Sequence, residues 1–185
     1  MKLGKIFFNQ PTVDLAKSLL GKYIVLGGLK GMIVETEAYL FKGDPGCHAS
    51  KGITVRNAPM FGPAGCIYVY LIYGMYHCLN IVSGKEGEGE AVLIRALEPV
   101  NGIPLMQRRR KTKKIENLCN GPGKLTQAFG ITRKYNNLSL FDGPIYIENN
   151  KMKPDIIKST RIGLNAGKEL ELRFYIDGNE FVSRK

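Results

Sequence analysis

The sequence predicts an α+β fold: a single domain with a mixed, mainly antiparallel β core, flanked by helices and carrying a protruding β-hairpin. Several short segments are rich in β-branched and aromatic residues, which favours strands. Glycine- and proline-rich turns separate them, and the helical patterns are short. We find no internal repeat and no linker-like change in composition. We therefore expect one domain over residues 1–185, which is long enough for a sizeable core.

The first third of the chain predicts one helix and two strands before a long loop. Apolar residues recur at helical spacing over 11–20. Strands are expected over 23–29 and 32–40, joined near Gly31. The segment 41–63 is irregular and rich in glycine and proline, and such a long loop in a compact domain is usually functional or mobile.

A β-hairpin is the clearest element of the middle of the chain. Its strands are expected at 67–72 and 76–82, with Tyr73-Gly74-Met75 as the turn. A large aromatic residue at an exposed tip is unusual, because burial would normally hide it. The remaining expected elements are a strand at 91–97, short helices at 103–110 and 124–129, and strands at 145–148, 161–164 and 172–176.

The most informative stretch is MIVETEAYL, residues 32–40. Side chains alternate along a strand, so Glu35, Glu37 and Tyr39 share one face. Paired carboxylates in an apolar setting lower the stability of the fold but are useful for catalysis. Burial and a neighbouring like charge both raise a carboxyl pKa. The pattern therefore predicts a general base. A plain salt-bridged strand residue is the alternative for Glu37.

Arg95 lies inside the apolar strand predicted at 91–97, where a charge requires a partner or a functional reason. Glu35 could supply that partner, or it could pair with Arg56 instead.

The chain is strongly basic, with 27 Lys and Arg against 16 Asp and Glu and a formal net charge of +11. Much of the excess is concentrated in QRRRKTKK, residues 107–114. This favours a polyanionic partner, most simply nucleic acid, although a solvated surface or a mobile loop is an alternative.

Composition also argues against several classes of protein. No run of about 18 apolar residues could span a membrane, and the apolar stretch near the N-terminus is too short for a signal peptide. We expect a soluble, intracellular monomer, which would lie in the cytoplasm or nucleoid if the source is prokaryotic. The cysteine spacings match no zinc pattern, so we expect reduced, structural cysteines and neither a metal nor another cofactor. These residues are Cys47, Cys66, Cys78 and Cys119.

Taken together, several motifs resemble those of the alkyladenine, or methylpurine, DNA glycosylase family. The resemblance runs in one consistent order from about residue 19 to residue 175. The motifs are VETEAY (34–39), CH (47–48), RN (56–57), MFGPAG (60–65), YVYLIYGMYHCLN (68–80), RALEP (95–99), CNGPGKL (119–125) and RFY (173–175).

The resemblance implies a monofunctional enzyme of base excision repair. Such an enzyme flips an alkylated or deaminated purine (the 3-methyladenine, 7-methylguanine and hypoxanthine class) out of double-stranded DNA and hydrolyses its N-glycosidic bond, with no lyase activity. Glu37 matches the base that activates water, and Arg95 matches a residue near that water and the DNA backbone. Tyr39, His48 and Tyr70 match the residues that sandwich the flipped base.

Two further matches concern selectivity and DNA binding. Asn80 matches a pocket residue that disfavours guanine, and Tyr73 matches the residue that intercalates into DNA. The chain departs from the family in having Val55 before the Arg-Asn pair and Leu172 before Arg-Phe, which puts the substrate range in doubt more than the reaction. The residues that we expect at the DNA backbone are Arg56, Arg108, Arg109, Arg110, Lys111 and Lys124.

Three alternatives stay open on sequence grounds. A metal-dependent nuclease could use Glu35, Glu37 and His48 as ligands. A bifunctional glycosylase–lyase would use a lysine nucleophile. A non-catalytic DNA-binding module would need none of these carboxylates.

Overall fold

The structure is a computed structural model that describes residues 1–184, and it confirms the α+β class. Eight strands form one curled sheet in which every pairing is antiparallel. Six of them follow the order β3-β4-β5-β2-β1-β6. Strand β8 also pairs with β2, and β7 pairs with β8. The strands are β1 Tyr23–Leu26, β2 Leu29–Tyr39, β3 Ile67–Ile72, β4 Tyr76–Val82, β5 Ala91–Asn101, β6 Ile145–Glu148, β7 Ile156–Ser159 and β8 Arg173–Ile176.

Four α-helices and three short 3-10 helices accompany the sheet in the part of the chain that the structure describes. No helix within residues 1–184 is long and apolar enough to cross a membrane. The helices are α1 Lys5–Phe8, α2 Thr12–Ser18, α3 Ile103–Arg110 and α4 Pro122–Phe129, with 3-10 helices at Ala58–Phe61, Ile115–Asn117 and Arg133–Tyr135.

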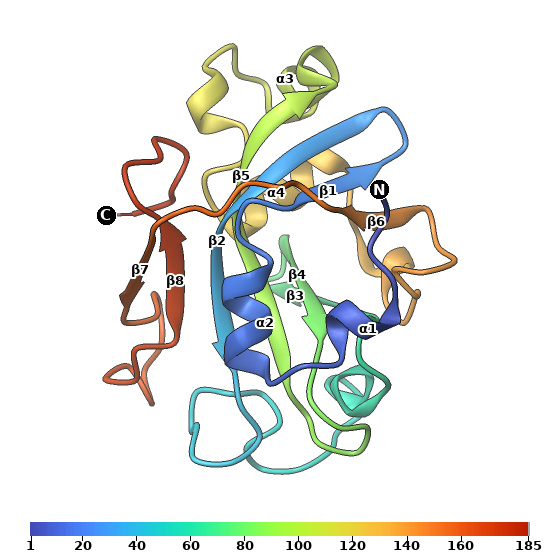
Figure 1. Ribbon diagram of the computed structural model, residues 1–185, viewed down its shortest axis with the longest axis vertical. Coiled ribbons are helices and arrows are strands. Elements are labelled where there is room, and N and C mark those ends of the chain that lie inside the picture. The colour runs from blue at the N-terminus through green and yellow to red at the C-terminus, as the bar shows by residue number, and fades with distance from the viewer. Residues whose placement is uncertain (185) are drawn as a thin grey trace.

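The long central strand β2 organises the fold. One edge of β2 pairs with β5, while its other edge pairs first with β1 and then, over Glu35–Glu37, with β8. Helix α2 lies in front of the sheet, against β2 and β5 (Figure 1). The buried Thr36 hydroxyl donates a hydrogen bond of 2.8 Å to the Ala16 carbonyl of α2. Because side chains alternate along a strand, the neighbouring carboxylates of β2 point to the other face, away from α2.

Several predicted elements have the predicted bounds, and others do not. The hairpin strands and α3 lie at 67–72, 76–82 and 103–110, as predicted. The turn between β1 and β2 lies at Gly27-Gly28 instead of near Gly31, because Gly27 adopts the positive φ of +57° that a tight turn requires. Helix α4 begins at Pro122, where proline suits the first turn of a helix.

The predicted strand at 161–164 is wrong. The strand in this part of the chain is β7, which begins five residues earlier and pairs with β8, whereas 161–164 is irregular. The reason is that its polar groups are used elsewhere: Arg161 binds a buried carboxylate, and the Ile162 amide donates to Glu37. Helix α1 was not anticipated from the sequence.

Candidate active site

Glu37 lies fully buried on the face of β2 opposite α2. One carboxylate oxygen, Oε1, accepts a hydrogen bond of 2.9 Å from the Ile162 amide and lies 3.1 Å from Nη1 of Arg95. The other, Oε2, accepts a hydrogen bond of 2.8 Å from the Tyr39 hydroxyl. These contacts fix the carboxylate and leave acceptor capacity on Oε2.

Glu35 lies on the same face but has different partners. Its Oε1 is 3.1 Å from Nε of Arg95 and 2.9 Å from Nη1 of Arg173, and its Oε2 accepts a hydrogen bond of 2.8 Å from the Ser183 amide. The apolar setting expected for the carboxylates is therefore wrong, because guanidinium groups surround them. Of the two partners expected for Glu35, Arg95 is right and Arg56 is wrong.

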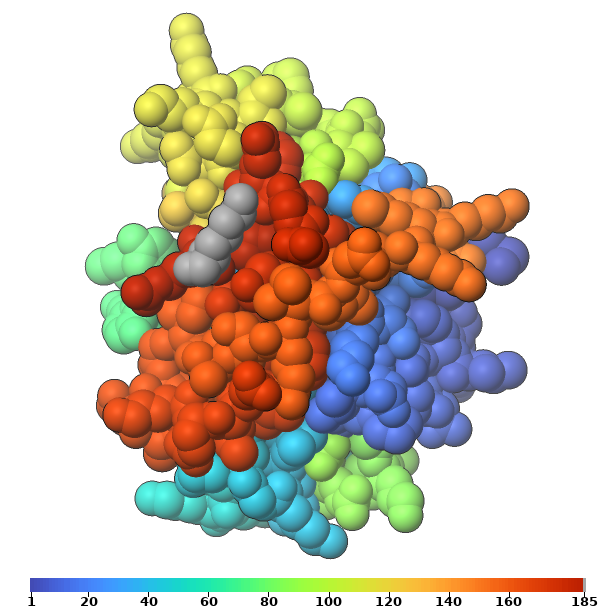
Figure 2. Space-filling view, turned by 60° about the vertical axis from the view of Figure 1, so that its left-hand side comes forward, coloured from blue at the N-terminus to red at the C-terminus, as the bar shows by residue number. Residues whose placement is uncertain are grey.

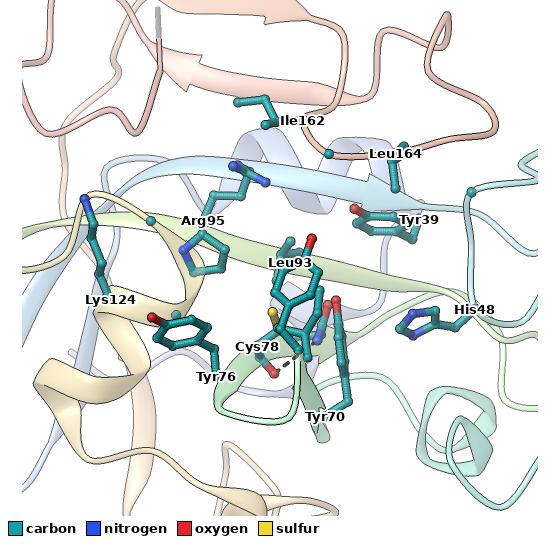
Figure 3. Close-up of a pocket in the computed structure, with 18 of the residues that line it drawn as sticks. Tyr39, His48, Tyr70, Tyr76, Cys78, Leu93, Arg95, Lys124, Ile162 and Leu164 are labelled. Atoms are coloured by element: carbon teal, nitrogen blue, oxygen red, sulfur yellow. Dashed lines mark hydrogen bonds between the residues drawn. The ribbon is translucent and has the colours of Figure 1, made fainter.

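A cavity of about 590 Å³ opens over these carboxylates. Figure 3 shows Tyr39, His48 and Tyr70 on one side of it and Arg95 and Lys124 on the other. Glu37 has no exposed surface, but its three partners Tyr39, Arg95 and Ile162 all line the cavity, so it lies directly beneath the wall. The sequence-predicted residues that line the cavity are Tyr39, His48, Tyr70, Tyr73, Asn80, Arg95, Arg110 and Lys124.

Aromatic rings form one wall of the cavity. The rings of His48 and Tyr70 meet edge to face at 4.6 Å, and Nδ1 of His48 lies 3.2 Å from the Tyr68 hydroxyl. Burial, aided by the charge of Arg56, lowers the pKa of His48, so the imidazole is neutral at pH 7. Burial likewise raises the phenol pKa of Tyr39 and Tyr70. The wall is therefore aromatic and uncharged.

Asn57, from the Arg-Asn motif, holds the loop that carries His48. Its Nδ2 donates to the carbonyls of His48 at 2.8 Å and Gly52 at 3.0 Å, and its Oδ1 accepts from the Thr54 amide at 2.6 Å. A single buried amide thus replaces regular secondary structure in placing this wall of the cavity.

A second buried ion pair supports Tyr39 from behind. The two terminal nitrogens of Arg161 bind both oxygens of Asp44, at 2.6 and 2.5 Å, and its guanidinium lies 4.6 Å from the centre of the Tyr39 ring. Asp44 also accepts hydrogen bonds from the amides of Leu40 and Gly46. Sequence reasoning missed Asp44 and Arg161. The only available signal was a glycine-rich loop, because their contact spans 117 positions of the chain.

The hairpin tip presents Tyr73 to solvent, with 79% of its surface exposed. Tyr73 and Gly74 have φ of +52° and +69°, and the Met75 amide donates to the Ile72 carbonyl at 3.2 Å. Two successive positive φ angles are typical of the tight turns that close hairpins. In Figure 2 the tip is the green projection at the left-hand edge, below the yellow segment around residues 110–120.

The residues that we predict to contact the DNA backbone fall into three groups. Lys124 and Arg110 line the cavity, and Figure 3 shows Lys124 on the side away from His48. Arg56 lies across the Tyr70 ring at 5.2 Å and donates to the Leu71 carbonyl of the hairpin. The rest of the basic run does not line the cavity: Arg108 and Lys111 are exposed, and Arg109 donates to the Ala128 carbonyl, joining α3 to α4.

The carboxylates and histidine of the nuclease alternative do not converge. Within residues 1–184 no three His, Cys, Asp or Glu side chains are placed to hold a metal ion.

Comparison with known proteins assigns this site to a class. A sequence model described as methylpurine-DNA glycosylase matches residues 6–180. Three curated relatives bear names that propose 3-methyladenine DNA glycosylase activity. The relative from Methanoculleus marisnigri is 49% identical over the whole of both chains. The relative from Prosthecochloris aestuarii is 50% identical over 96% of this chain and 89% of its own. The relative from Carboxydothermus hydrogenoformans is 48% identical over the whole of both chains.

Such a match over nearly the whole chain defines the class as DNA N-glycosylases. The chain belongs to the methylpurine-DNA glycosylase family.

Proposed function

We propose that this protein is a monofunctional glycosylase that flips alkylated or deaminated purines, of the 3-methyladenine, 7-methylguanine and hypoxanthine class, out of duplex DNA. It hydrolyses the N-glycosidic bond and so begins base excision repair, acting as a monomer without a cofactor. The observation that carries the proposal is the position of Glu37, held directly beneath an aromatic cavity by Tyr39 and Arg95.

The cavity suits a planar damaged base. Tyr39, His48 and Tyr70 offer ring faces and edges, and stacking of a base on aromatic rings contributes about 1–3 kcal/mol per base. An alkylated purine carries positive charge, which aromatic faces attract and a neutral His48 does not repel. Asn80 lines the cavity, and its Nδ2 donates to the Tyr68 carbonyl at 3.1 Å. In this proposal its amide is the group that disfavours guanine.

Glu37 performs the chemistry in this proposal. Its carboxylate takes a proton from a water molecule, and the water oxygen forms a bond to the sugar C1′ while the bond from C1′ to the base nitrogen breaks. The negative charge of Glu37 also stabilises the positive charge that develops on the sugar. Arg95 and Ile162 hold Oε1, which leaves Oε2, beside the Tyr39 hydroxyl, to accept the proton.

The surface around the cavity mouth supports DNA binding. Tyr73 fills the gap that the flipped base leaves, as apolar wedges do between base steps. Arg56, Arg110 and Lys124 contact the phosphates beside the mouth, and Arg108, Arg109 and Lys111 extend this basic surface. Counterion release at such contacts makes binding sensitive to salt.

Replacing Glu37 by Gln tests the proposal. We expect single-turnover excision of hypoxanthine or 7-methylguanine to fall by about 10²–10⁴, the usual contribution of general base catalysis. Binding to an abasic-site analogue should persist. Glu148→Gln, which changes a carboxylate in an ion pair with Lys30 away from the cavity, is the matched control and should retain full activity. Normal excision by Glu37→Gln contradicts the mechanism and favours another general base.

The catalytic alternatives give different results in simple assays. Base release that continues in excess EDTA is expected here and contradicts a metal-dependent nuclease. Borohydride should trap no covalent protein–DNA adduct, whereas a lyase with a lysine nucleophile would give one.

A further inference from the structure

Four buried side chains form a row of alternating charge beneath the cavity. Nη1 of Arg173 lies 2.9 Å from Oε1 of Glu35, the same oxygen lies 3.1 Å from Nε of Arg95, and Nη1 of Arg95 lies 3.1 Å from Oε1 of Glu37. Each of the four is at most 7% exposed. The row ends at the carboxylate that we propose as the base.

The row holds Arg95 rigidly. Its Nε and Nη1 bind the two carboxylates, and its Nη2 lies 3.4 Å from the Ser183 hydroxyl, so every edge of the planar guanidinium has a partner. Glu35 is the junction, because it also binds Arg173 and accepts the Ser183 amide. Loss of Glu35 would therefore remove a carboxylate partner from both arginines.

The C-terminal region completes this arrangement by holding Arg173. Its Nε donates to the Thr160 carbonyl at 2.9 Å, its Nη1 to the Arg184 carbonyl at 2.9 Å, and its Nη2 to the Ser159 hydroxyl at 3.2 Å. The end of β7 and the segment after β8 thus converge on one arginine.

The buried charges sum to zero. Among residues 1–184 the buried acidic residues are Glu35, Glu37 and Asp44, and the buried basic residues are Arg95, Arg161 and Arg173. Asp44 and Arg161 neutralise each other behind Tyr39. The remaining two carboxylates and two guanidiniums are the members of the row.

This balance matters because the substrate itself carries charge. An alkylated base enters as a cation, and the sugar becomes cationic in the transition state. Arg95 lines the cavity, and its positive charge would oppose both if Glu35 did not offset it. The positive charge of Arg173 in turn offsets part of the negative charge of Glu35, so Arg95 stays paired with Glu37 as well.

We propose that Glu35 and Arg173 are positioning residues that fix Arg95 and set how strongly the site prefers a positively charged damaged base over a neutral one. This inference rests on the proposed function. It assigns the preference to residues that line no part of the cavity.

The test compares two substrates in one duplex sequence: 7-methylguanine, which is cationic, and hypoxanthine, which is neutral. Single-turnover excision at enzyme concentrations below saturation, where the rate includes binding of the damaged base, gives a cationic-to-neutral ratio for each variant. Glu35→Gln should lower the ratio and Arg173→Gln should raise it. Each change should be on the order of tenfold, as expected for one buried unit charge that acts through the protein interior at an effective dielectric constant of about 20. A purely structural role would reduce both rates equally and leave the ratio unchanged, which would overturn the inference.

A double variant keeps the test valid if a single variant unfolds. A lone buried charge is strongly destabilising, whereas Glu35→Gln with Arg173→Gln removes one charge of each sign. The double variant should keep the ratio within about threefold of the wild type. Both rates should fall, because Arg95 loses its ion pair with Glu35. A tenfold change in its ratio, or full rates on both substrates, would overturn the inference. Glu35→Asp keeps the charge and should also preserve the ratio.

Failure here is distinguishable from failure of the proposed function. If the unmodified protein releases neither base, the proposed function fails, and if Glu37→Gln is fully active, its mechanism fails. If the unmodified protein is active and the ratio does not respond to Glu35 and Arg173, only this inference fails.

Discussion

Replacing Tyr73 by Gly should make the protein more stable and its DNA binding weaker. Tyr73 has φ of +52°, a left-handed conformation that L-residues other than glycine rarely adopt, and 79% of its surface is exposed. It therefore carries backbone strain and contributes little packing to the folded state. Such a combination is expected of a residue that acts on a ligand, because strain of this kind gathers at functional sites.

The two opposing effects can be given magnitudes. A left-handed residue costs about 1–2 kcal/mol, and the added flexibility of glycine in the unfolded chain costs about 0.5–1 kcal/mol. Tyr73→Gly should thus gain about 0.5–1 kcal/mol of unfolding free energy and raise the Tm by about 1–4 °C. Loss of ring stacking worth about 1–3 kcal/mol should weaken binding to abasic-site or lesion DNA by about 5- to 150-fold.

Thermal denaturation and fluorescence anisotropy with a labelled duplex measure the two effects. Tyr73→Phe keeps the ring and the strain, so its affinity and Tm should both remain close to those of the wild type. Tyr73→Asn, whose side chain tolerates the left-handed region, should behave like the glycine variant in binding. Wild-type affinity in Tyr73→Gly would refute intercalation, and a lower Tm would refute the strain argument.

Three other predictions follow from the site. The logarithm of the affinity for duplex DNA should fall by about 0.9 per phosphate contact for each tenfold rise in salt, and a flat profile would reject the basic surface as the footprint. His48 has a lowered pKa, so its contribution to folding should be complete above pH 6.5 and decline as the pH falls through its folded-state pKa; His48→Phe should abolish this decline in urea denaturation. Asp44→Asn should lower the unfolding free energy by about 3–5 kcal/mol, because Arg161 loses its buried partner, and an unchanged denaturation midpoint would contradict that.

Local patterns in the sequence were enough for the central elements of the fold. Alternation placed Glu35, Glu37 and Tyr39 on one face of β2, and turn chemistry placed Tyr73 at the tip between β3 and β4. These features depend on the period of a strand and on the φ preferences of a few turn residues, so neighbouring residues determine them. Motif order likewise identified the family, which the comparisons confirm.

Only the tertiary structure decided what surrounds those side chains. Arg161 was expected in a strand, but its pairing with Asp44 and the Ile162 amide at Glu37 take that segment out of the ladder. A pairing across more than a hundred residues leaves no periodic trace in the chain, because it arises where separate segments meet. The sequence by itself thus determined which face of β2 carries the carboxylates. The fold decided that Glu37 ends a row of balanced charges beneath an aromatic cavity, since burial makes every charge there require a partner.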